Sequence, residues 1–117
     1  MKKLISVILL VCVMGLIFVG CGVTTITSSV VEYEITGSAS KVDVTLQNET
    51  GGTEQYSDVS VPHTYTFNYY TDWFLYISAQ NQGDSGSVTV TIYVDGEVFK
   101  TSTSSGAYVI ASASGSR

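Results

Sequence analysis

Several residue types that build catalytic or metal sites are scarce in this chain. Its 117 residues include only 1 histidine, 1 proline and 2 cysteines, and charged residues make up 13%. A single histidine excludes a histidine-rich zinc site and leaves carboxylate clusters as the only metal option. The balance of 5 basic against 10 acidic residues excludes a basic nucleic-acid-binding module. The length limits the chain to one domain and excludes large α/β enzymes, repeat solenoids and polytopic membrane proteins.

The apolar residues are concentrated at the N-terminus, where Lys2 and Lys3 precede a nearly unbroken apolar run over residues 4–19. A charged start followed by a short apolar run is typical of a secretory signal. The run is shorter than the roughly 20 apolar residues that a membrane-spanning helix needs. The alternative is an uncleaved anchor, in which the run continues through residues 20–23. Both interpretations place the rest of the chain outside the membrane.

The apolar run ends in Phe18-Val19-Gly20-Cys21, which resembles the lipobox of bacterial lipoproteins, with phenylalanine in place of the usual leucine. The resemblance implies that the Cys21 thiol is alkylated by diacylglycerol and that the chain is cut just before it. A lipoprotein cysteine carries two or three acyl chains, which meets the requirement of at least two membrane signals for stable anchoring.

The lipobox predicts three parts of the chain. We expect a lipoprotein signal peptide over residues 1–20, a lipid-anchored tether over residues 21–29 and an extracytoplasmic domain over residues 30–117. The tether is short, small and uncharged. It reaches about 25 Å or less, so it keeps the domain close to the bilayer.

Under this interpretation the mature domain has no free thiol, because Cys12 leaves with the signal peptide and Cys21 carries lipid. It therefore has no disulfide, no cysteine zinc site and no thiol nucleophile. Removal of Lys2 and Lys3 also takes the formal net charge from −5 to −7. This charge disfavours nucleic acid and anionic lipid headgroups as partners.

From residue 30 onward apolar residues alternate with polar ones at a period of two, which predicts an all-β domain. Apolar side chains on both faces of residues 73–79 indicate a central strand or one that is partly covered by another part of the structure. The expected strands lie at residues 31–35, 42–46, 53–59, 65–69, 73–79, 88–94, 97–102 and 107–112. Seven or eight strands of this length favour an antiparallel β-sandwich with an immunoglobulin-like arrangement.

Turn residues separate these strands. Asp95-Gly96 predicts a two-residue hairpin turn, because such a turn requires positive φ. Residues 48–52 predict a second hairpin loop for the same reason. Pro62 lacks a backbone donor, so it belongs at the start of a strand or on a sheet edge.

One motif suggests serine-protease chemistry. Gly83-Asp84-Ser85-Gly86 matches the nucleophile loop of chymotrypsin-like proteases, and His63 and Asp72 precede it in the right order. That machinery needs two barrels to bring three distant residues to an oxyanion hole, which a domain of this length cannot build. Glycine, aspartate and serine are also the residues that loops prefer, so we interpret the motif as a loop.

The acidic residues offer little further chemistry. Glu32 and Glu34 share one strand face, a spacing that in principle pairs two carboxylates for glycoside hydrolysis, but no cleft or second domain accompanies them. The other acids lack calcium-loop spacing, so adventitious calcium binding is the weaker alternative to a solvated acidic surface. We expect no catalytic residue, no cofactor and no metal site.

The aromatic residues Tyr69, Tyr70, Trp73 and Phe74 bracket an expected tight turn at residues 71–72. Alternate members must point away from the core, and exposed aromatic clusters commonly bind hydrophobic partners or stack on sugars. Tyr70 and Trp73 are therefore candidate interaction residues. The alternative is that the aromatic group caps the open end of the sandwich.

Several short segments of the domain together resemble the MmpS family of accessory proteins of MmpL-type exporters. They occur in the family's order and spacing, over residues 31–114, and are VEYEITGSA at 31–39, VP at 61–62, ISAQN at 77–81, IYVDG at 92–96 and GAY at 106–108. The resemblance implies an N-terminal membrane anchor, an extracytoplasmic β-sandwich and a large proton-driven transporter of the RND class as partner.

This chain departs from the family pattern in three ways. Relatives commonly carry two cysteines in the last strands, where this chain has Val90 and Ala113, so their disulfide is absent here. The tryptophan that commonly follows the proline is His63. The anchor is a lipobox rather than a plain spanning helix, which suggests a bacterium outside the mycobacteria.

Two functions of different classes follow from these observations. The first is a non-catalytic accessory subunit of an RND-type exporter, which acts through protein contacts on one sheet face or through the aromatic turn. The second is a stand-alone cell-surface lipoprotein that binds a glycan or lipid ligand through Tyr70 and Trp73. The chain is held in the membrane through acylated Cys21 in both.

Overall fold

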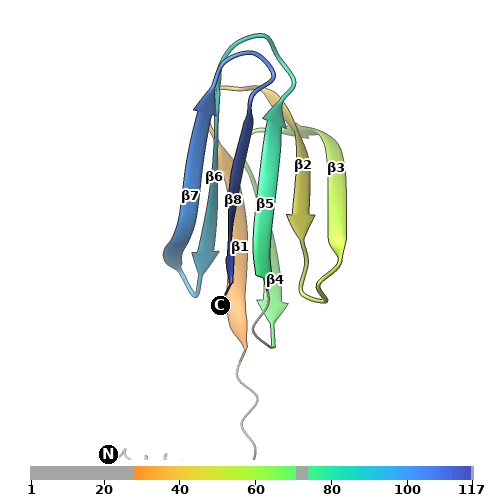
Figure 1. Cartoon of the computed structure of the whole chain (residues 1–117), viewed down its shortest axis with the longest axis vertical. Coiled ribbons are helices and arrows are strands. Elements are labelled where there is room, and N and C mark those ends of the chain that lie inside the picture. Colours follow the sequence, from red (N-terminus) through yellow and green to blue (C-terminus); the bar gives the residue numbers. More distant parts are fainter. Residues whose placement is uncertain (1–27, 71–73, 117) are drawn as a thin grey trace, which may run out of the picture.

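The computed structural model describes residues 28–70 and 74–116, and this part of the chain is built from strands without helices (Figure 1). None of the described residues forms a helix that could cross a membrane. The strands are β1 (Ser29–Thr36), β2 (Lys41–Gln47), β3 (Thr53–Ser60), β4 (His63–Tyr69), β5 (Phe74–Asn81), β6 (Ser87–Val94), β7 (Glu97–Ser105) and β8 (Ile110–Ser116).

The eight strands form two four-stranded antiparallel sheets, in the orders β4-β1-β6-β7 and β3-β2-β5-β8. The sheets pack face to face as a sandwich, which confirms the predicted fold class and is consistent with the immunoglobulin-like arrangement (Figure 1). Only the β2–β3 and β6–β7 hairpins stay within one sheet, and every other connection crosses to the opposite sheet. Strands that are distant in the sequence therefore lie side by side.

Alternation of apolar and polar residues positions the core. In β1, Val31, Tyr33 and Ile35 are buried and the glutamates between them face outward. The same pattern occurs in β2, β5 and β6, whose inward residues form one continuous core. Because successive side chains of a strand point to opposite faces, this period of two could be read directly from the sequence.

The two sides of the sandwich differ in the size of their inward residues. β8 contributes Ala111 and Ala113, and the two sheets approach most closely along the β7–β8 side. The Phe99 ring of β7 lies directly over Gly115, where an added Cβ would meet the ring at 3.0 Å. On the other side, the inward residues of β4 are aromatic and fill a wider space between the sheets.

The predicted turns are present. Asp95 and Gly96 have φ values of 51° and 84°, as a two-residue primed turn requires. The Asn48 side chain accepts hydrogen bonds from the backbone N–H groups of Thr50 and Gly52 and so organises the β2–β3 loop. Pro62 directly precedes β4, which is an edge strand, in agreement with the prediction.

The boundaries of the later strands differ from the prediction. The last strand was expected at residues 107–112, but β8 runs over Ile110–Ser116. Gly106 and Tyr108 have φ values of 123° and 55°, which bend the chain into a loop, so the apolar residues 107–109 lie outside the strand. β5 is a central strand as predicted, but its core residues occupy one face only, because Phe74 is exposed and Leu75 is buried.

Candidate interaction site

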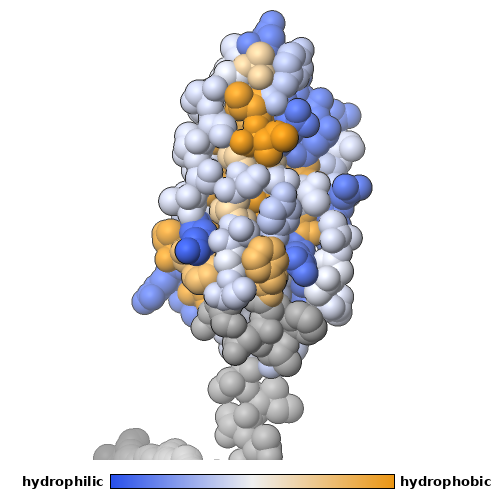
Figure 2. Space-filling model, viewed as in Figure 1, coloured by the Kyte–Doolittle hydropathy of each residue, from blue (hydrophilic) through white to orange (hydrophobic). Residues whose placement is uncertain are grey.

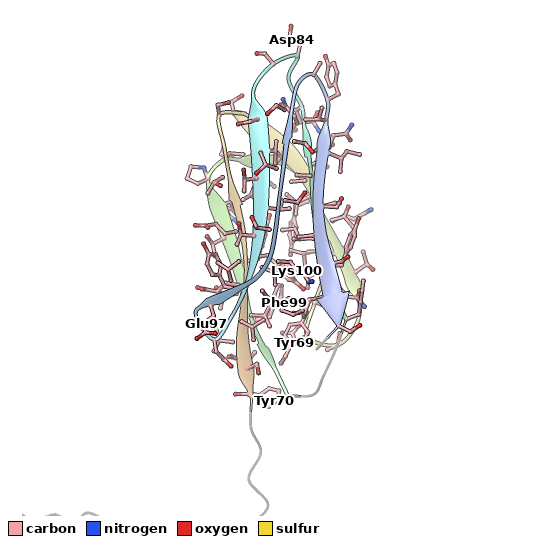
Figure 3. The ribbon with its side chains drawn as sticks, turned by 60° about the vertical axis from the view of Figure 1, so that its left-hand side comes forward. Tyr69, Tyr70, Asp84, Glu97, Phe99 and Lys100 are labelled. Carbon is pink, nitrogen blue, oxygen red and sulfur yellow. The ribbon has the colours of Figure 1, made fainter. Side chains whose placement is uncertain are left out.

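The structure describes two of the three protease-like residues, and one of them, His63, begins the edge strand β4. Ser85 lies in the loop between β5 and β6, at one end of the sandwich, which we call the distal end (Figure 3, where Asp84 marks it). Asp72 lies outside the described residues. Tyr70 and the start of β5 lie at the opposite end. We call that opposite end, where β1 begins, the proximal end.

The buried Asn81 side chain, which is 1% exposed, organises the loop that holds the Gly-Asp-Ser-Gly motif. Its Nδ2 donates to the carbonyl oxygens of Ser85 at 2.8 Å and Gly106 at 3.1 Å, and its Oδ1 accepts from the Gly83 N–H at 2.8 Å. A buried amide is stabilising only when its hydrogen-bonding groups are paired. The motif is therefore part of a structural hydrogen-bond network, in agreement with its interpretation as a loop.

The two glutamates of β1 face outward from a central strand. The Glu34 carboxylate accepts a hydrogen bond from the Tyr93 hydroxyl of β6 at 3.0 Å. This bond raises the pKa of the Tyr93 phenol, because loss of the phenolic proton would remove the bond and place two negative charges together. Among residues 28–70 and 74–116, no group of three or more His, Cys, Asp or Glu side chains is placed to hold a metal ion.

The aromatic residues at the end of β4 separate as the alternation predicts. Tyr69 is 2% exposed and Tyr70 is 62% exposed, and Figure 3 shows Tyr70 at the extreme proximal end of the molecule. Trp73 and Cys21, the other predicted site residues, lie outside the described residues. Of the predicted interaction pair, the structure therefore places Tyr70 alone.

Tyr69 supports this end of the sandwich from inside. The hydroxyls of Tyr69 and Tyr33 both donate to the Gln47 carbonyl oxygen at 2.7 Å, so two side chains of one sheet reach the end of β2 in the other. Burial raises the pKa of both phenols, and the Tyr33 hydroxyl, whose oxygen lies 3.2 Å from that of Tyr69, raises the pKa of Tyr69 further. These contacts connect the two sheets beneath the exposed Tyr70.

Four exposed apolar side chains surround the proximal end, and we call them the apolar collar. They are Val30 at 40% exposure, Tyr70 at 62%, Phe74 at 44% and Val98 at 58%. Val30 and Val98 lie on the outer face of one sheet and Phe74 on the outer face of the other, since Val31, Phe99 and Leu75 point inward. Figure 2 shows hydrophobic side chains near this end on the face that it presents.

A shallow hollow lies beside the collar at the β6–β7 turn. It has a volume of about 340 Å³ and is lined by Val94, Asp95, Glu97, Val98 and Phe99. Its lining is more polar than apolar and includes the carboxylates of Asp95 and Glu97.

Two hydrogen bonds join the start of β1, which carries Val30 of the collar, to the β6–β7 turn. The Val30 N–H donates to Asp95 Oδ1 at 2.8 Å, and the Asp95 N–H donates to the Val30 carbonyl oxygen at 2.8 Å. The start of the first strand is thus bonded to the β6–β7 turn that carries Val98. The ammonium group of Lys100 lies 5.4 Å from the centre of the Phe99 ring in the same region, a separation that permits a cation–π contact.

A second aromatic cluster lies along the side of the sandwich and was not predicted. The rings of Tyr56 in β3 and Tyr65 in β4 stack at 4.9 Å, and His63 lies 4.5 Å from Tyr65. The Tyr56 hydroxyl donates to the Glu54 carboxylate, and this hydrogen bond raises the pKa of the phenol. The strands belong to different sheets, so no pattern within either segment indicates that their aromatic rings meet.

The distal end carries its own exposed apolar pair, Tyr108 at 57% and Ile110 at 55%. The backbone around this pair is committed to hydrogen bonds, since the Tyr108 N–H donates to the Gly83 carbonyl oxygen at 3.1 Å. In exposure these two residues match Tyr70 and Val98 of the collar. They offer a comparison between two similar surfaces at opposite ends.

No family model matches this chain, and no curated protein is similar to it. The MmpS resemblance and the lipobox therefore stay predictions. Val90 and Ala113, which stand where relatives commonly carry cysteines, are both buried on facing sheets. His63, which stands in place of a tryptophan, is exposed and contacts Tyr65.

Proposed function

We propose that the chain is an extracytoplasmic lipoprotein, anchored through acylated Cys21, that serves as a non-catalytic accessory subunit of an RND-type, MmpL-like exporter. The observation that supports this proposal best is the position of the apolar collar. It surrounds the end of the sandwich at which β1 begins. Since β1 is the strand nearest in sequence to the proposed anchor, we expect a membrane component to be met at this end. Large exposed apolar patches on small domains commonly mark interaction sites.

The rigidity of the domain supports a binding role. Two hydrogen bonds join the start of β1 to the β6–β7 turn, and two tyrosine hydroxyls join the sheets beneath Tyr70. A surface whose backbone is already ordered loses little conformational entropy on binding, which favours affinity. A transporter subunit in the same membrane would meet this surface at the height that the tether sets.

A stand-alone surface lipoprotein that binds a glycan or lipid is the second candidate. The stacked Tyr56 and Tyr65 rings beside the Glu54 carboxylate favour it, because aromatic faces together with hydrogen-bonding groups are the chemistry that recognises sugars. In this alternative exposed Tyr70 contributes further ligand contacts, and Trp73 remains the second predicted contact residue.

The anchor is tested by metabolic labelling with a fatty acid. The Cys21→Ala variant should lose the label and accumulate unprocessed precursor, because the thiol is the acceptor of the diacylglyceryl group. Cys12→Ala is the matched control and should be labelled like the unchanged chain. Label that persists in Cys21→Ala would refute the lipobox interpretation.

The partner is tested by crosslinking in native membranes followed by affinity recovery of the full chain. Recovery of a large multi-spanning transporter supports the accessory role, and a transporter gene beside the coding frame would agree with it. Repeated recovery of envelope polysaccharide without a transporter would instead support the second candidate. Replacing Tyr56 by serine should weaken recovery of polysaccharide only.

A further inference from the structure

The apolar collar lies at the end of the domain where β1, which follows the proposed tether in the sequence, begins. Seven residues, 22–28, separate Cys21 from the first strand, and a fully extended chain of this length spans about 25 Å. An eight-residue strand adds roughly 26 Å between the two ends of the sandwich. The collar is therefore within reach of the bilayer to which Cys21 would be attached, whereas Tyr108 and Ile110 lie a strand length farther away.

The collar has the composition of a surface that enters the boundary between lipid headgroups and acyl chains. It combines aliphatic side chains with the exposed phenol of Tyr70, an amphipathic ring of the kind that is enriched at membrane interfaces. Its members lie on both outer faces of the sandwich, so they can be buried together when the end of the domain meets a plane. A flat protein partner on one sheet would cover only part of them.

The charges at this end indicate which lipids fit. Asp95 and Glu97 line the hollow beside Val98, and Lys100 is the one cation beside them among the described residues of the β6–β7 hairpin. The excess of carboxylates is repelled by anionic headgroups and tolerated by zwitterionic ones. Repulsion of this kind extends over a Debye length of roughly 8 Å at physiological salt.

We infer that the apolar collar seats the proximal end of the sandwich on a zwitterionic lipid surface, so that the domain stands upright with its distal end away from the membrane. This inference rests on the proposed membrane anchoring and adds a specific contact and orientation to it. An upright domain leaves both outer sheet faces and the Tyr56–Tyr65 stack open to other partners.

The test places a fluorescent label at either end of the full chain. Ser116 and Ser105 are both exposed serines at the ends of edge strands, β8 at the proximal end and β7 at the distal end. Ser116→Cys and Ser105→Cys are each labelled and reconstituted through the chain's own anchor into phosphatidylcholine vesicles that carry a quencher at the headgroup boundary. The unsubstituted chain measures background labelling at Cys12 and Cys21.

We expect the lipid-borne quencher to reduce the emission of the Ser116 label and to leave that of the Ser105 label nearly unchanged. The combined Tyr70→Asn and Val98→Thr variant should lose this difference. The matched Tyr108→Asn and Ile110→Thr variant should keep it; asparagine tolerates the positive φ of Tyr108. Equal quenching at the two labels, or a difference that survives the collar variant, would overturn the inference.

Lipid composition provides a second readout. Replacing half of the phosphatidylcholine by phosphatidylglycerol should reduce quenching of the Ser116 label, and added salt should restore it. Stronger quenching on phosphatidylglycerol would overturn the assignment to a zwitterionic surface. The vesicles contain no exporter, so this experiment tests the lipid contact alone. Crosslinking in native membranes tests the association with an exporter, and either proposal can therefore fail without the other.

Discussion

The two ends of the sandwich use their side chains in different ways. At the distal end, polar groups bond to one another: Asn81 holds the loop of residues 82–86, and Ser87 holds the β1–β2 connection through Ala39 and Ser38. At the proximal end, the backbone is tied down and the apolar collar remains exposed. The comparison teaches that the Gly-Asp-Ser-Gly loop is structural and that exposed apolar side chains occur at both ends, four in the collar against Tyr108 and Ile110 at the distal end.

The largest expected effect comes from the closest approach at the distal end. A Cβ at Gly37 would lie 2.3 Å from the Ser87 carbonyl oxygen, and the residue has a φ of 129°. Gly37→Ala should therefore lower the free energy of unfolding by about 3 kcal/mol or more, as measured by urea denaturation. Gly96→Ala in the proximal turn is the matched control, because its φ is 84° but no atom lies within 4 Å.

The control separates steric overlap from backbone strain. Gly96→Ala should cost about 1 kcal/mol, the penalty for a left-handed conformation alone. Equal losses in the two variants would contradict the account of the distal end as the more tightly packed one.

The next largest effect concerns the buried amide of the distal end. Asn81→Ala removes three hydrogen bonds and leaves the Ser85 and Gly106 carbonyl oxygens and the Gly83 N–H without this partner. We expect a loss of about 3 kcal/mol in the free energy of unfolding. Asn68→Ala, on the exposed face of edge strand β4, should change it by less than about 0.5 kcal/mol. A neutral Asn81→Ala would show that the loop does not depend on this network.

Alkaline pH tests the proximal interior. The pKa values of Tyr33 and Tyr69 are raised in the folded protein, first by burial, so the unfolded chain releases these protons at lower pH than the folded one. Their contribution to stability is therefore complete below about pH 10 and is lost as the pH rises toward the folded values. Thermal unfolding followed above pH 10 should show this decline, and Tyr69→Phe should make it shallower. If stability declined with pH equally steeply in Tyr69→Phe, the result would contradict the assignment of a raised pKa to Tyr69.

The smallest expected effect on stability comes from the collar itself. The Tyr70→Asn and Val98→Thr variant should change the free energy of unfolding by less than about 0.5 kcal/mol, because both side chains are mostly exposed. The Tyr108→Asn and Ile110→Thr variant should have an equally small effect on the free energy of unfolding. If the melting temperature dropped strongly in the collar variant but not in the distal variant, Tyr70 and Val98 would instead belong to the packing of the proximal end.

Local patterns predicted most of the strands but missed where the last one begins. The alternation in β1 and the Asp95-Gly96 turn depend on neighbouring residues only, and both predictions are confirmed. The expected strand at residues 107–112 was wrong at its ends, because Ala107, Tyr108 and Val109 have an apolar composition that a strand would also have. The positive φ of Tyr108 is set by the loop's bonds to residues 83 and 86, which no local pattern encodes.

The candidate site likewise has features that local patterns predict and features that they do not. Exposure of Tyr70 next to buried Tyr69 followed from alternation along one strand, but the collar joins Val30, Phe74 and Val98 from other strands. The stack of Tyr56 on Tyr65 joins edge strands of different sheets. Whether these side chains come together depends on which strands become neighbours and where each strand ends.

The sequence by itself determined the all-β class, the inward face of each central strand and the scarcity of residues for catalysis, because these depend on composition and on a period of two along the chain. The tertiary structure decided that the four exposed apolar side chains of the collar lie at one end of the sandwich. It did so because pairing of β1 with β4 and β6, and of β5 with β8, brings the ends of distant strands together at a single surface.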